Sequence, residues 1–186
     1  MTWTEIAEQL DDTTGLGRRA AQCQAAAWSA GLDPAATRGL TGAALALGAA
    51  PGDLMGQVAP WRTDRAMLAA ADDLAADVAR QLRRVQQTRQ AVSADLQAAR
   101  AELARASAAR PPDLAAITAA RRRIADCETA LEILGQVALR LGYARTRLAE
   151  IPGDLAETYQ AANRHVQAGG ILPYEGRWLT GTGPRR

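Results

Sequence analysis

The sequence predicts an all-α protein built on a long antiparallel helical hairpin, with a group of short N-terminal helices and an irregular C-terminal tail. Residues 63–109 contain neither proline nor glycine, and their apolar side chains recur in steps of three and four, as in a coiled coil. The same steps resume at Leu114. Because the link between the two stretches is short, we expect the two helices to be antiparallel neighbours.

A repeated tetrapeptide marks the places where helices are expected to begin. Pro-Gly-Asp-Leu stands at residues 51–54 and again at 152–155, and Pro-Pro-Asp-Leu stands at 111–114. Proline does not continue a preceding helix, whereas aspartate accepts hydrogen bonds from the free N–H groups of a new first turn. The motif therefore predicts a helix end followed by a helix start at all three places.

The N-terminal region is predicted to form four short helices, separated by glycines. We expect them at residues 4–12, 17–30, 34–48 and 53–59, with breaks at Gly15, Gly31 and Gly48. The first long helix follows, and a helix of its length must bury its apolar stripe against a neighbour. That stripe consists of Val78, Leu82, Val85, Val92, Leu96, Ala99, Leu103 and Ala106.

The second long helix has an apolar stripe of its own, and charges support its pairing with the first. With the turn near residue 110, Arg121–Arg123 face Asp95 and Glu102, and Arg140, Arg145 and Arg147 face Asp72, Asp73 and Asp77. Such pairs help to fix orientation and add little stability. The stripe consists of Leu114, Ile117, Ala120, Ile124, Cys127, Leu131, Leu134, Ala138, Leu141, Ala144 and Leu148.

The apolar face of this second helix widens at Ala130, Ile133 and Val137, which predicts a third packing neighbour. Two candidates for this third neighbour are considered: the helix expected after Pro152, and the N-terminal helices. We expect four regions in all. They are an N-terminal short-helix region (1–60), the long hairpin (61–150), a third packing helix (151–168) and an irregular tail (169–186).

Composition narrows the classes of function. All 22 basic residues are arginine, against 20 acidic residues, and a net charge of +2 is too small to imply a polyanionic partner. Cys23 and Cys127 fit no metal-ligand spacing, and we expect neither a metal nor another cofactor. The acidic N-terminus does not resemble a signal peptide, and no apolar stretch is long enough to span a membrane. A cytoplasmic protein is expected.

No catalytic constellation is evident, so we expect a protein that is not an enzyme. The one histidine, His165, is placed in the last turn of a predicted helix, where its charge suits the helix dipole. The sequence shows no serine–histidine motif and no phosphate-binding glycine loop.

Residues Thr4–Ala20 resemble the core of a helix-turn-helix motif. A helix of the type Glu-Ile-Ala-x-x-Leu precedes a turn, and Thr13 or Thr14 opens a second helix; Asp11 and Gly17 depart from the usual pattern. The resemblance implies DNA binding through the second helix. The residues of this alternative nucleic-acid interface are Arg18, Arg19, Arg80, Arg83, Arg84, Arg121, Arg122 and Arg123.

The tail supplies the candidate site for a protein partner. Tyr174, Arg177 and Trp178 lie in a glycine-rich segment, and aromatic and arginine side chains supply much of the energy of protein interfaces. Our preferred hypothesis is therefore a non-enzymatic interaction or assembly protein that binds a protein partner or another copy of itself. The alternative is a nucleic-acid-binding or regulatory protein.

Overall fold

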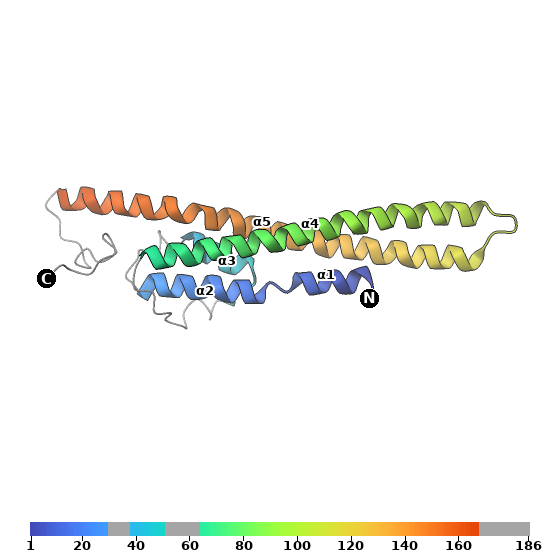
Figure 1. Ribbon diagram of the computed structural model, residues 1–186, viewed down its shortest axis with the longest axis horizontal. Helices are drawn as coiled ribbons and strands as arrows, with labels where there is room; N and C mark the ends of the chain where they lie inside the picture. Colours follow the sequence, from blue (N-terminus) through green and yellow to red (C-terminus); the bar gives the residue numbers. More distant parts are fainter. Residues whose placement is uncertain (30–37, 51–63, 168–186) are drawn as a thin grey trace. The chain divides into compact units, whose positions relative to one another are not determined.

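The regular secondary structure in the described part of the chain consists of helices, with no strands. The computed structural model describes residues 1–29, 38–50 and 64–167. Three short helices, α1 (Trp3–Asp11), α2 (Thr14–Ser29) and α3 (Arg38–Ala46), precede two long ones, α4 (Asp64–Ala108) and α5 (Leu114–Gln167). Figure 1 shows α4 and α5 side by side as an antiparallel hairpin, which confirms the predicted fold class. None of the described helices is long and apolar enough to cross a membrane.

Contacts divide the chain into two compact units. The first unit consists of Met1–Asp12 and Arg80–Arg140, and the second consists of Thr13–Ala79 and Leu141–Arg186. Each unit therefore contains part of α4 and part of α5. The domain boundaries predicted at residues 60, 150 and 168 follow composition rather than contacts and stay predictions.

The tetrapeptide motif begins a helix at one place and not at another. At 111–114 the prediction is confirmed, because Asp113 Oδ1 accepts a hydrogen bond from Ala116 N at 3.0 Å and α5 begins at Leu114. At 152–155 it is wrong, because α5 continues to Gln167. Pro152 removes only one intrahelical hydrogen bond, and the many hydrogen bonds before and after it allow the long helix to continue. The copy at 51–54 lies outside the described residues.

Of two helix breaks predicted at glycines, one is present and the other is not. Gly48 ends α3 as expected: it has a φ of 86°, Ala49 N donates to Ala44 O at 2.9 Å, and Gly48 N donates to Leu45 O at 3.1 Å. This Schellman motif satisfies carbonyls of the last turn. The break expected at Gly15 is wrong, because α2 already begins at Thr14. Gly31 and the helix expected at 53–59 lie outside the described residues.

The core of the first unit lies along part of the predicted apolar stripes of α4 and α5, and α1 packs beside it; Leu114, expected in the second stripe, is exposed instead. Asp126 binds the start of α1 and Arg140 pairs with Asp11 near its end, so α1 lies along the widened face of α5. The N-terminal alternative for the third neighbour is therefore confirmed. The buried seam residues are Leu82, Val85, Val92, Leu96, Ala99, Ala120, Cys127, Ala130, Leu134 and Val137.

In the second unit, short side chains allow helices to pack closely. A Cβ on Gly17 of α2 would lie 2.9 Å from the carbonyl oxygen of Leu47, and a Cβ on Gly39 of α3 would overlap the carbonyl oxygen of Arg147 in α5. Only glycine permits such approaches. The buried core around them includes Ala20, Ala21, Leu40, Ala43, Ala44, Leu74, Val78, Leu141, Ala144, Leu148 and Ile151.

Candidate functional site

The largest cluster of interacting polar side chains described in the first unit surrounds the N-terminus of α1. Asp126 of α5 accepts hydrogen bonds from Trp3 N at 2.9 Å, Thr4 N at 3.1 Å and Thr4 Oγ1 at 2.7 Å. A capping box completes the first turn, since Glu5 N donates to Thr2 Oγ1 at 3.1 Å and Thr2 N donates to Glu5 Oε2 at 2.7 Å. A carboxylate from another helix thus binds the free N–H groups and the positive end of the α1 dipole.

A second carboxylate, Asp95 of α4, binds the indole of Trp3. Trp3 Nε1 donates to Asp95 Oδ2 at 2.8 Å, and the same oxygen accepts from Arg123 Nε at 3.0 Å. Arg123 also pairs with Glu102 at 3.1 Å, so one guanidinium joins two acids of α4 to α5. Hydrogen bonds from Arg123 and then from Trp3 lower the pKa of Asp95 to about 2.

Burial and hydrogen bonds shift the pKa values of the neighbouring ionisable groups. Burial raises the pKa of the Asp126 carboxyl, but hydrogen bonds from Thr4 and from the backbone of Trp3 and Thr4 outweigh burial and lower it overall. Burial, and next the charge of Asp95, raise the pKa of the Cys127 thiol to about 11. A protonated thiol and two carboxylates bound by donors are poor nucleophiles and poor bases. This cluster holds α1 to the hairpin.

More than half of the chain matches one protein family. Residues 34–140 match the family described as heavy-metal resistance. The chain belongs to this family. No curated protein and no solved structure matches it.

Membership in the heavy-metal resistance family raises the question of a resident metal ion. Within the described ranges, no group of three or more His, Cys, Asp or Glu side chains is placed to hold one. Cys23 and Cys127 are both buried, and burial raises the pKa of both thiols, whereas a metal binds the thiolate. Asp95 and Asp126 already bind protein donors. The described residues therefore do not fit a resident metal ion.

The arginines of the alternative nucleic-acid interface fall into two groups. Arg19 pairs with Asp77 in the second unit, and Arg123 pairs with Asp95 in the first, so both bind acids of this chain. The other six are exposed as well, and Arg80 among them also interacts within the chain: Arg18, Arg80, Arg83, Arg84, Arg121 and Arg122. Arg18 and Arg19 lie on α2, which begins at Thr14 as the helix-turn-helix resemblance implies.

Several predicted charge pairs do not form as expected. Arg140 pairs with Asp11, and Arg147 pairs with Glu150 at 2.5 Å, rather than with the acids of α4. The predicted register of the hairpin is confirmed at Arg123, which pairs with both Asp95 and Glu102. Arg140 and Arg147 instead pair with closer acids, Asp11 of α1 and Glu150 of α5. Tyr174, Arg177 and Trp178 lie outside the described residues, as does the side chain of His165.

The role of Trp3 and Asp126 was missed by sequence reasoning. Capping between helices depends on pairing Asp126 with residues 122 and 123 positions away, and no local pattern encodes that pairing. The hydrophobic periodicity of α5 gave the only available signal, namely the widened face that α1 covers.

The ionised form of Asp95 is expected to stabilise the first unit in a pH-dependent way. Its pKa of about 2 is below the ordinary value near 3.9, so this stabilisation is present in full above about pH 4 and is lost as the pH falls toward 2. Asp95→Asn should lower the free energy of unfolding by about 1–2 kcal/mol at pH 7. The loss should shrink between pH 4 and pH 2.

Chemical unfolding followed by circular dichroism at a series of pH values measures this effect. Asp72→Asn removes an exposed carboxylate from the same helix and serves as the control. A deficit of Asp95→Asn that stays constant from pH 7 to pH 2 would show that the Asp95 charge does not stabilise the fold.

Proposed function

We propose that this member of the heavy-metal resistance family is a non-enzymatic interaction protein that assembles with a second copy of itself through an exposed face of α5. Support comes from the polar cluster, whose carboxylates and thiol are used to hold helices together. The misfit between the described residues and a resident metal also favours a role through macromolecular contacts. The proposal rests on the surroundings of two residues in the first unit, Gly135 and Leu139.

Nothing among the described residues accounts for Gly135 and Leu139. Leu139 is 69% exposed, and a Cβ added to Gly135 would meet nothing within 4 Å. Glycine inside a helix costs about 1 kcal/mol relative to alanine, and here no close approach within the described chain requires it. The two residues are one turn apart on one face of α5. This face therefore combines an exposed apolar side chain with an open space beside it.

A second copy fits this face because the contact is self-complementary. In an antiparallel two-fold pairing, Leu139 of each copy lies over Gly135 of the other, and each leucine occupies the space that a Cβ would fill. Gln136, on the same face, is uncharged. The nearest exposed charge on this face of α5, Glu132, would lie about 15 Å from its copy along the helix axis, beyond the screening length at physiological salt.

The expected association is weak. Burying two leucines contributes about 3–6 kcal/mol, which does not by itself outweigh the roughly 4–15 kcal/mol of translational and rotational freedom lost on association, so further contacts along this face of α5 must contribute. We therefore expect a dimer with a dissociation constant no tighter than about the millimolar range. Because the contact is apolar, raising the salt concentration should change this constant little.

Sedimentation equilibrium over a wide range of protein concentration tests the proposal. The wild-type chain should show a monomer–dimer equilibrium, and Leu139→Ser should weaken it about tenfold or more. Leu45→Ser changes another exposed leucine, on α3 in the second unit, and should leave association unchanged. A wild-type chain that stays monomeric at millimolar concentration, or equal effects of the two substitutions, would refute self-assembly through α5.

A further inference from the structure

The end of the hairpin has no buried core. In the first unit the last fully buried seam residues are Ala99 and Ala120, and every described side chain from 101 to 119 is exposed or only partly buried. Leu114 is 73% exposed. Residues 106–112 contain three alanines and two prolines and no acidic residue. The hairpin therefore ends in a weakly packed, largely apolar tip, defined here as residues 101–119.

Four arginines around this tip have no acidic partner among the described residues. All five acids between residues 95 and 128 already accept hydrogen bonds or ion pairs from this chain, and their ion-pair partners are Arg100 and Arg123. Arg105 donates Nε to a backbone carbonyl, that of Ala101, at 3.4 Å. The arginines without a described ion pair are Arg105, Arg110, Arg121 and Arg122, and we call them the arginine collar.

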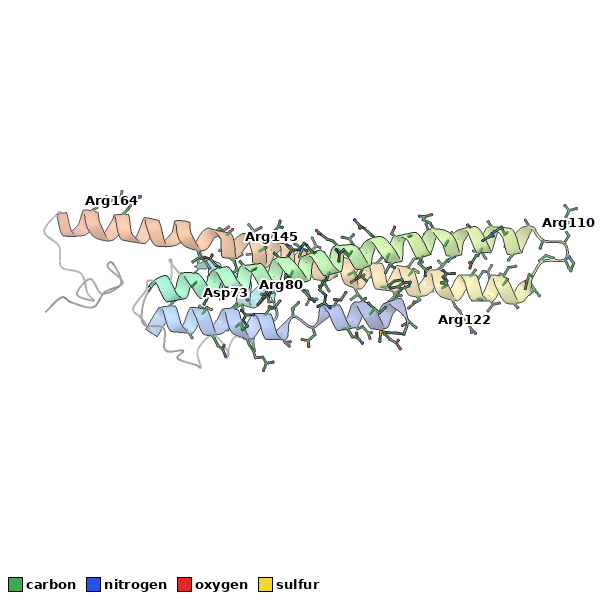
Figure 2. All side chains as sticks on the ribbon, viewed as in Figure 1. Asp73, Arg80, Arg110, Arg122, Arg145 and Arg164 are labelled. Carbon is green, nitrogen blue, oxygen red and sulfur yellow. The ribbon has the colours of Figure 1, made fainter. Side chains whose placement is uncertain are left out.

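The collar lies close to the tip and points to several sides. By helical rise, Arg105 and Arg122 lie about 5 Å and about 12 Å from the ends of their helices. Figure 2 shows Arg110 at the turn and Arg122 on α5 directed away from the hairpin on different sides. An apolar end surrounded by cations suits contact with a flat anionic layer whose interior is apolar.

We propose that the hairpin tip docks end-on onto an anionic lipid membrane surface. Leu114 and the alanines and prolines of the turn enter the headgroup boundary, and the arginine collar binds the lipid phosphates. This is surface docking and needs no membrane-spanning helix. The proposal is independent of self-assembly through α5, since it uses other residues.

A membrane surface explains the tip better than a nucleic acid does. Nucleic-acid binding through phosphates favours arginines aligned along one groove, and single strands also need aromatic side chains for stacking. Arg110 and Arg122 point to different sides of the hairpin, and residues 64–142 contain no aromatic residue. An exposed leucine at the centre of the basic collar contributes to binding only where it is removed from water.

Vesicle flotation of the full chain tests the proposal. We expect binding to phosphatidylcholine vesicles that contain about one-third phosphatidylglycerol, weaker binding at about 500 mM than at about 50 mM NaCl, and no binding to pure phosphatidylcholine. Arg121→Gln with Arg122→Gln should lower the partition coefficient about 25-fold, at about fivefold for each arginine. Leu114→Ser should lower it about five- to tenfold without a change of charge.

Matched control variants test whether the loss of vesicle binding is specific to substitutions at the tip. Arg83→Gln with Arg84→Gln removes the same charge from α4, about 37 Å by helical rise from the end of that helix at the turn, and should bind vesicles like the wild-type chain. Leu139→Ser should also bind normally, because it lies outside the tip. Circular dichroism checks that each variant is helical, and glutamine keeps the helix propensity of arginine.

Three results would overturn the proposal. The first is equal binding to neutral and anionic vesicles. The second is an equal loss of vesicle binding for the Arg121/Arg122 and Arg83/Arg84 variants, which would mean that binding depends only on the net charge of the chain. The third is absence of vesicle binding together with tight, Arg121- and Arg122-dependent binding to an oligonucleotide duplex in fluorescence anisotropy, which would make a nucleic acid the partner.

Discussion

Gly39→Ala is expected to destabilise the second unit by about 2–3 kcal/mol. A Cβ at this position would overlap the carbonyl oxygen of Arg147 and lie 2.9 Å from Cγ1 of the buried Ile151. A backbone carbonyl inside α5 cannot rotate away as a side chain does. Alanine therefore forces α3 away from α5 and opens gaps among the buried residues beneath it.

Gly42→Ala is the matched control, one turn along the same helix. Its Cβ would meet the side chain of Arg147, with Nε at 2.8 Å, and a flexible side chain can move aside. We expect a loss below about 1 kcal/mol, partly offset by the better helix propensity of alanine. Urea unfolding followed by circular dichroism measures both variants. Equal losses for Gly39→Ala and Gly42→Ala would contradict the close packing of α3 on α5.

Leu134→Ala should cost the first unit about 2–5 kcal/mol. Leu134 is fully buried in the seam of α5, so its truncation removes apolar contacts and leaves a cavity. Leu114→Ala makes the same chemical change in the same helix, but at an exposed position, and should cost less than about 0.5 kcal/mol. Equal losses for the two leucines in thermal or urea unfolding would mean that the seam is not the core.

The long hairpin could be predicted from the sequence because its signals are local and repeat many times. The absence of proline and glycine over residues 63–109 predicted α4 within a residue at each end, and Asp113 correctly marked the start of α5. The helix break expected after Pro152 was wrong because one proline cannot outweigh the hydrogen bonds that α5 forms on both sides.

The candidate sites could be predicted only in part, because each depends on distant pairings. The pairing of Arg123 with Asp95 and Glu102 followed from the hairpin register. The capping of α1 by Asp126 did not, since it requires knowing where α1 packs. The exposed face at Gly135 and Leu139 was missed for a similar reason: Leu139 resembles any apolar residue until its exposure is known.

The central claim, assembly through α5, is tested most directly by measuring stability and association on the same variant, Gly135→Ala. No atom of the described residues lies within 4 Å of a Cβ there, so the substitution should raise the free energy of unfolding by about 0.5–1 kcal/mol. The same methyl group occupies the space for the partner's Leu139, so the sedimentation dissociation constant should rise several-fold. Gly15→Ala, at an equally open position on α2, should leave association unchanged. A Gly135→Ala chain that is more stable and associates as the wild type does would contradict the account.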